Sequence, residues 1–156
     1  MRPTRPPIGF YLTQTARAVS RAFDDTLAEA GGSLPVWLVL LNLKTRRLAN
    51  QRELAGAVGL REATLTHHLN AMEANGLITR RRDPVNRRIH VVELTGAGEA
   101  AFMDMRAAAV SFDRRVRRGI TDREIAGLES LLARLAANVG VEQEQSTGHI
   151  GSGPEV

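Results

Sequence analysis

Cysteine is absent from this 156-residue chain, and only one of its 21 basic residues, Lys44, is a lysine. Without cysteine, the chain has no disulfides, thiolate metal sites or cysteine-based redox switches. Aromatic residues make up only 4% of the chain. No apolar run approaches the roughly 20 residues of a membrane-spanning helix, and the N-terminus lacks the apolar segment of a secretion signal. We therefore expect a cytoplasmic protein.

What the chain has in excess is arginine. The formal net charge is +4 and the sequence pI is about 10.8. Arginine forms bidentate contacts with phosphates and with guanine edges, so this composition favours a nucleic-acid partner. Codon bias in a high-GC genome is the alternative explanation of the arginine excess, but it does not explain the clustering of arginines between residues 80 and 88. The length suits one compact core or one domain with extended arms.

The first third of the sequence predicts two helices. Apolar residues recur at helical spacing from Ile8 to Ala30, so we predict a first helix over these residues. The glycines at 31–32 end it. Ser33 is a suitable N-cap and Pro35 fits a first turn, so a second helix begins there and runs to Leu41 or beyond.

Two shorter helices and a hairpin follow. Asn50 and Glu53 resemble a capping box, which predicts a helix over residues 51–58 and, after Gly59, a longer one over residues 61–75. Strands are predicted over residues 78–82 and 89–94, joined by a loop with the turn chemistry Asp-Pro-Val-Asn. Two helices before a β-hairpin predict a winged helix-turn-helix, in which the helix over 61–75 is the recognition helix.

Between residues 80 and 88 the predicted hairpin contains five arginines and one carboxylate, Asp83. A cluster with so little counter-charge favours a polyanion over a solvated hairpin, which is the alternative. Strand alternation places Arg80 and Arg82 on one face and Arg81 on the other. We expect Arg87 to lie at the wing tip as the probe of phosphates or the minor groove. Arg88 is expected to pair with Asp83 across the turn.

The C-terminal part predicts two amphipathic helices. One covers residues 96–118, and the other begins with a capping box of Thr121 and Glu124 and runs to Val139. These helices and the N-terminal one carry more apolar surface than one winged-helix core can bury, so we predict a two-fold dimer; a monomeric bundle is the alternative.

The predicted fold is mainly α with a small β-wing. Its parts are an N-terminal arm and dimerisation helix over 1–32, a DNA-binding domain over 33–96, dimerisation helices over 97–139 and a disordered tail over 140–156.

On the recognition helix, Leu65, Leu69 and Met72 share one face and are expected in the core. The opposite face is small and polar, as entry into the major groove requires. An ordinary surface role is the alternative for the two histidines; base contact is favoured for His67, and the two interpretations are balanced for His68. Adjacent helical side chains diverge by about 100°, so the pair is a poor zinc site, and we expect no metal or cofactor. The predicted DNA-binding residues are Arg61, Ala63, Thr64, Thr66, His67, His68, Asn70, Arg80, Arg82, Arg87 and Arg88.

From Ser33 to Gly98 the chain resembles the MarR family of bacterial transcriptional regulators. The resemblance lies in the order and spacing of segments 34–37, 53–55, 64–69, 73–80, 83–88 and 94–98. Two positions depart from the family pattern. Asn86 stands where aspartate is usual, which removes one stabilising ion pair from the wing, and His67 stands where arginine is frequent. Operator preference therefore does not carry over from the family.

The resemblance implies a homodimeric regulator, a repressor or an activator, that binds a pseudo-palindromic DNA operator. It also implies a small aromatic or phenolic effector held between the dimer helices and the DNA-binding lobe. Tyr11 and Trp37 are the aromatics nearest that crevice, although core packing is the favoured interpretation of each. Three other hypotheses are an architectural DNA binder without a fixed operator, a protein adaptor and an enzyme. The sequence has no catalytic motif that supports an enzyme, and we expect no catalytic residue.

Overall fold

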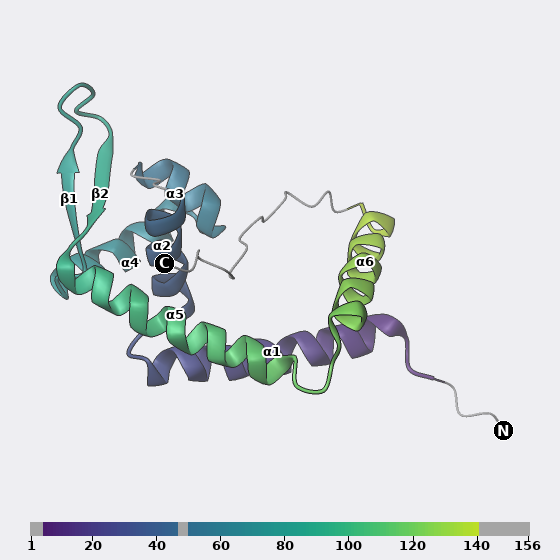
Figure 1. The fold of residues 1–156 in the computed structure, drawn as a ribbon. Coiled ribbons are helices and arrows are strands. Elements are labelled where there is room, and N and C mark those ends of the chain that lie inside the picture. The colour runs from purple at the N-terminus through teal and green to yellow at the C-terminus, as the bar shows by residue number, and fades with distance from the viewer. Residues whose placement is uncertain (1–4, 47–49, 141–156) are drawn as a thin grey trace. The chain divides into compact units, whose positions relative to one another are not determined.

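The computed structural model describes residues 5–46 and 50–140 and confirms the mainly helical fold with a two-stranded wing (Figure 1). The elements are α1 (Ile8–Glu29), α2 (Leu34–Thr45), α3 (Gln51–Val58), α4 (Glu62–Ala74), β1 (Ile78–Arg82), β2 (His90–Leu94), α5 (Gly96–Val116) and α6 (Asp122–Asn138). The chain divides into two compact units, residues 1–109 and residues 110–156. The tail predicted to be disordered lies, from residue 141 on, outside the described residues.

Among the described residues, no single helix is long and apolar enough to cross a membrane. The consecutive helices α1 and α2 meet that requirement only as a pair, bent by 76°.

Local sequence signals account for most helix ends. The recognition helix α4 is bracketed by Gly59 and Gly76, whose φ angles of 72° and 70° lie in the left-handed region that favours glycine. At the start of α6, Thr121 and Glu124 form the predicted capping box with both reciprocal hydrogen bonds. Helix α2 begins as predicted at Leu34, although the Ser33 side chain makes no capping hydrogen bond.

The start of α3 differs in part from its prediction. The Asn50 side chain accepts a hydrogen bond from the backbone N–H of Arg52 at 2.9 Å, so its capping role is confirmed. Within the described residues, Glu53 returns no hydrogen bond to the Asn50 backbone, so the expected capping box is wrong in its second half. Asn50 instead forms an isolated antiparallel bridge with Val91 of β2. This pairing ties the start of α3 to the wing.

The core of the first unit gathers side chains from each of its helices and from both strands. The least exposed large side chains are Leu27, Val39, Leu40, Leu54, Leu65, Leu69, Met72, Ile78, Val92 and Met105. The predicted inward stripe of α4, namely Leu65, Leu69 and Met72, is confirmed, with exposures of 0%, 0% and 1%. Burying three such side chains opposes any rotation of α4 about its axis.

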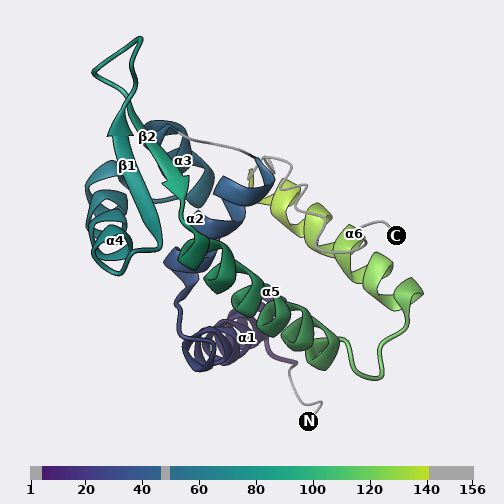
Figure 2. The ribbon, with the colours of Figure 1, turned by 60° about the vertical axis from the view of Figure 1, so that its left-hand side comes forward.

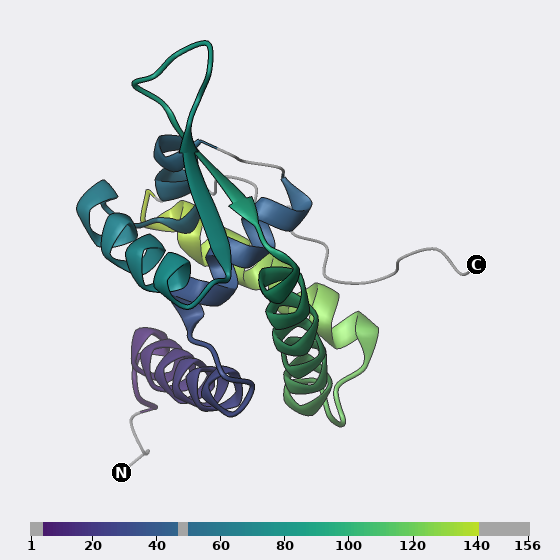
Figure 3. The same ribbon diagram turned by 90° about the vertical axis from the view of Figure 1, so that its left-hand side faces the viewer.

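The wing is an antiparallel hairpin in which Ile78 pairs with Leu94 and Arg82 with His90. Its loop extends beyond α3 and α4, as Figure 2 and Figure 3 show from two directions. The second strand begins at His90, one residue later than predicted. The reason is that Ile89 closes the turn: its backbone N–H donates to Asn86 and its carbonyl accepts from Asp83, both at 2.9 Å.

Thr95 joins the wing to the start of α5. Its hydroxyl donates to the Gly76 carbonyl at 2.5 Å and accepts from the Gly98 backbone N–H at 3.0 Å. The Thr95 backbone N–H donates to the Leu77 carbonyl at 3.1 Å. At this crossing Gly98 lies so close to the Leu77 carbonyl that a Cβ atom would collide with it.

We expect Gly98→Ala to lower the free energy of unfolding by about 1–3 kcal/mol, because the added methyl group must displace backbone. Gly96→Ala, in the same helical turn, is the matched control, because a Cβ there has no neighbour within 4 Å. The measurement is thermal unfolding of both variants. Equal melting temperatures for the two variants would contradict the close packing at Gly98.

Candidate nucleic-acid interface

The face of α4 opposite its buried stripe is exposed and small. Ala63, Thr64, His67 and Asn70 are exposed, and His68 is half-buried. Arg61, at the N-cap position, is exposed as well. The two histidine rings are 5.8 Å apart and inclined at 66°. Donors and acceptors of this size suit the base edges of a major groove, where bulky side chains would block approach.

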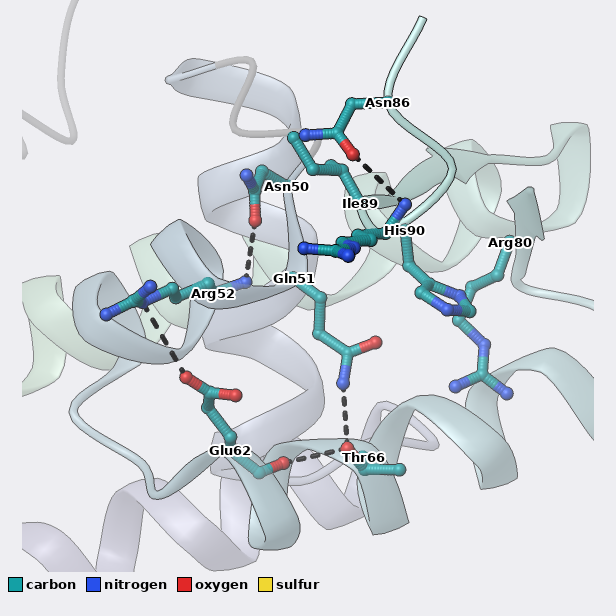
Figure 4. Close-up of a pocket in the computed structure, with 10 residues that line it drawn as sticks. Asn50, Gln51, Arg52, Glu62, Thr66, Arg80, Asn86, Ile89 and His90 are labelled. Atoms are coloured by element: carbon teal, nitrogen blue, oxygen red, sulfur yellow. Dashed lines mark hydrogen bonds and ion pairs between the residues drawn. The ribbon is translucent and has the colours of Figure 1, made fainter. Parts of the chain in front are cut away.

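Thr66 has a structural partner that the sequence did not predict. Its hydroxyl accepts a hydrogen bond from the Gln51 side chain at 2.7 Å and donates to the Glu62 carbonyl at 2.8 Å (Figure 4). The half-buried Thr66 side chain therefore links α4 to α3. Its hydroxyl group is therefore already engaged in hydrogen bonds within the helix-turn-helix.

Arg80 of β1 is also held by α4. Its side chain donates to Glu73 Oε2 from Nε at 3.0 Å and from Nη2 at 2.6 Å, and its backbone N–H donates to Oε1 at 3.1 Å. The Nη2 atom also donates to Asn70 Oδ1 at 2.6 Å. Hydrogen bonds and charge from Arg80 hold the pKa of Glu73 below its ordinary value. The Arg80 side chain is only 18% exposed, so its contacts are with protein.

Arg81 has a cross-strand partner in Glu93, at 2.8 Å between Nη2 and Oε1. Hydrogen bonds from Arg81 lower the pKa of Glu93, and the same pair raises the pKa of Arg81. The expectation that Asp83 is the only counter-charge of the wing is therefore wrong. Helix α4 and strand β2 supply two carboxylates that the hairpin sequence between residues 80 and 88 does not contain.

The loop of the wing is shaped by short polar side chains. Asp83 Oδ1 accepts from the backbone N–H groups of Val85 and Asn86 at 2.7 and 2.8 Å, which lowers the pKa of Asp83. The predicted pair between Arg88 and Asp83 is wrong, because the carboxylate serves the turn. Asn86, which stands where the family usually has aspartate, accepts from the Arg88 backbone N–H at 3.2 Å.

Three wing arginines have charges that are not neutralised by a carboxylate of the described residues. Arg82, Arg87 and Arg88 are exposed, and none forms an ion pair with a carboxylate of the described residues. They lie toward the loop end of the hairpin, whereas the paired Arg80 and Arg81 lie nearer its base. The unpaired positive charge of the wing thus lies toward the loop end of the hairpin.

A groove of about 620 Å³ separates the start of α3 and one side of α4 from the wing (Figure 4). The guanidinium and imidazole groups that line it belong to Arg52, Arg80, Arg88 and His90. One carboxylate, that of Glu62, also lines the groove, and its Oε1 lies 3.9 Å from Nε of Arg52. Sequence reasoning missed Gln51, Arg52 and His90 as members of this site. Their convergence depends on the bridge between Asn50 and Val91, for which the sequence carries no local signal.

The two aromatics considered for an effector site have different surroundings. Trp37 is 2% exposed and stacks on Phe102, with ring centroids 5.8 Å apart and planes inclined at 9°. Its core packing is confirmed. Tyr11 is 50% exposed, and its ring meets that of Phe10 edge-on, with centroids 6.1 Å apart. The core packing favoured for Tyr11 is therefore not found among the described residues of the single chain.

The ion pair of Arg80 and Glu73 gives a testable pH dependence. Because the pKa of Glu73 is lowered on folding, its stabilising effect is present above its unfolded value of 4.5 and is lost as the pH falls through the lower folded value. We expect Glu73→Gln to lower the melting temperature at pH 7 and to differ little from the parent at acid pH. Glu53→Gln is the control, since Glu53 has no ion pair within the described residues. A constant difference across the pH range would contradict the assignment.

Comparison with known proteins agrees with this geometry. The family model "MarR family" matches residues 33–90. The solved structure of transcriptional regulator PA3341 is 36% identical, has a TM-score of 0.70, and the match covers 85% of this chain and 98% of that one. The transcriptional repressor CouR bound to a 23-mer DNA duplex is 26% identical, with a TM-score of 0.72 and coverage of 83% and 92%. CouR from Rhodococcus jostii RHA1 bound to p-coumaroyl-CoA is 25% identical, with a TM-score of 0.68 and coverage of 87% and 96%. This chain belongs to the MarR family of transcriptional regulators.

Proposed function

We propose that this chain is a cytoplasmic, ligand-responsive repressor that binds a pseudo-palindromic DNA operator as a homodimer and has no enzymatic activity. One observation carries the proposal: the exposed polar face of α4 stands beside a wing in which three arginines form no ion pair with the described residues. The first element has the size and chemistry for base edges, and the second has the charge for phosphates.

Each element has a separate role in this proposal. Helix α4 enters the major groove, where each base pair presents a distinct pattern of donors and acceptors, and His67 contacts base edges there. The wing follows the neighbouring backbone and minor groove, where Arg87 supplies charge. Between them, the groove lined by Arg52, Arg88 and His90 faces the phosphate backbone that separates the two DNA grooves.

Apolar surface supports a dimer as the binding unit. Helix α6 has no buried residue, and the exposures of Leu128, Leu131 and Leu132 are 49%, 55% and 39%. Near the start of α1, Phe10 and Tyr11 are about half exposed. Exposed apolar stripes of this kind mark protein interfaces, and a two-fold axis matches the symmetry of a pseudo-palindromic site. The proposed parts are those expected from the sequence, with dimerisation helices on both sides of a DNA-binding domain over residues 33–96.

The effector is proposed to be a small aromatic or phenolic compound. The support is the likeness to CouR, which has been solved both on DNA and with p-coumaroyl-CoA. A ligand shifts DNA binding only if it prefers one of two conformations, and we propose that it changes the spacing of the two recognition helices. Of the two aromatics considered for this site, Tyr11 has the exposed ring, since Trp37 is buried against Phe102.

The dimer is tested on α6. Leu135 continues the apolar stripe of α6 beyond Leu132. Charge in this stripe should prevent association, so we expect the double variant Leu132→Glu with Leu135→Glu to be monomeric and to lose operator binding. Ser130→Glu is the matched control, because Ser130 is exposed and lies off the stripe. Sedimentation and DNA titration are measured on the same samples. A folded monomer with full DNA affinity would refute the dimer.

The two DNA-contacting elements are tested by titrating variants on the operator and on a scrambled duplex at several salt concentrations. Arg87→Ala should weaken binding to both duplexes and reduce the salt slope by roughly one unit, because one phosphate contact is lost. His67→Ala should cost about 1–3 kcal/mol on the operator and little on the scrambled duplex.

Arg106→Ala, at an exposed position of α5, controls for the loss of one positive charge outside the interface. An unchanged salt slope for Arg87→Ala, or equal losses on both duplexes for His67→Ala, would contradict the assigned roles. A parent protein that binds both duplexes equally would select the architectural hypothesis instead.

A further inference from the structure

We propose that Asn70 determines base specificity as a hydrogen-bond donor only, because its oxygen already accepts from the Arg80 guanidinium, whose charge opposes a second donor. The amide then selects a base with an acceptor in the major groove, guanine before all others, and rejects cytosine, which presents only a donor there. This inference rests on the proposed function, since it concerns the same face of α4.

The orientation of the amide follows from the chemistry of Arg80. A guanidinium has donors and no acceptor, so the Asn70 atom that lies 2.6 Å from Nη2 must be the carbonyl oxygen. Arg80 is itself immobilised by two side-chain hydrogen bonds to Glu73 Oε2 and by its backbone N–H, which donates to Oε1 of the same carboxylate. Asn70 and Glu73 are three residues apart on α4, so both face β1 from the same side of the helix.

The donor half of the amide is left for DNA. Asn70 is exposed, and its Nδ2 atom makes no hydrogen bond in the part of the chain that the structure describes. Oxygen and nitrogen diverge from the same carbon, so the N–H groups point away from the guanidinium. Asn70 follows His67 by three residues, which puts the two side chains on neighbouring positions of the exposed face.

This arrangement differs from the usual use of asparagine in DNA recognition. The bidentate pairing with adenine needs the oxygen to accept from N6 while the nitrogen donates to N7. Here the oxygen already binds a cation, whose charge opposes the approach of a second donor and favours an acceptor. Guanine offers two acceptors, O6 and N7, on one edge, and therefore fits the amide group best. Arg80 is a positioning residue in this scheme, because it acts through Asn70.

The test is selection from a pool of duplexes with a randomised core, using the full chain and two variants. The parent should select guanine and exclude cytosine at one position of each half-site. Asn70→Asp keeps an oxygen toward Arg80 and replaces the donor by an acceptor of the same size. We expect its preference at that position alone to change to cytosine, with roughly 10- to 100-fold weaker binding to the parent sequence.

Arg80→Met gives an independent test, because it frees the Asn70 oxygen without altering the amide. We expect adenine to become accepted at the same position. Arg81→Met is the matched control: it also removes one ion-paired arginine from β1, but the partner of Arg81 is Glu93 and not Asn70, so the preference at this position should not change. Thermal unfolding of each variant shows that the changes arise in a folded protein.

The results separate this inference from the proposed function. A parent that selects adenine at the position, or an Asn70→Asp variant that selects the same sequence as the parent, overturns the donor-only role while operator binding stands. A parent that selects no sequence at all overturns both. A change to cytosine with Asn70→Asp and a gain of adenine with Arg80→Met together establish the role.

Discussion

The buried stripe of α4 is the constraint on which the rest of the structure depends. Leu65, Leu69 and Met72 are almost fully removed from solvent, and each such side chain contributes about 1.5–3 kcal/mol when buried. A rotation of the helix by one residue would expose part of this surface and bury polar groups without partners. The face that carries His67 and Asn70 is therefore held outward by the packing of the opposite side of the helix. No contact made by these exposed side chains is needed to orient it.

The positive charge of the wing is divided between structure and function. Arg80 and Arg81 are bound by carboxylates of α4 and β2, and they hold the hairpin to the helix and its strands to each other. The arginines nearer the loop have no such partners among the described residues. A charge at the projecting end is the one that reaches a DNA backbone, whereas a charge at the base is surrounded by protein. The same residue type thus serves two purposes that differ only in the neighbouring carboxylates.

Much of the fold could be predicted from the sequence, because its signals act over a few residues. The glycines that bracket α4, the capping box of Thr121 and Glu124, and the spacing of apolar residues depend on neighbours within about one helical turn. The inward stripe of α4 followed from helical periodicity alone. Where such a signal was incomplete, as at Glu53 and Ile89, the prediction included one hydrogen bond that is not formed and one residue that lies outside the strand.

The sequence by itself determined the order of elements, the family resemblance and the outward face of the recognition helix. Only the tertiary structure decided which polar atoms on that face are available. Thr66 is engaged by Gln51 from 15 residues away, and Arg80 holds Asn70 from 10 residues away. The groove likewise joins Arg52 to His90 through the pairing of Asn50 with Val91. Such contacts depend on strand register and helix packing, which arise from the burial of the whole core, and no short stretch of sequence records them.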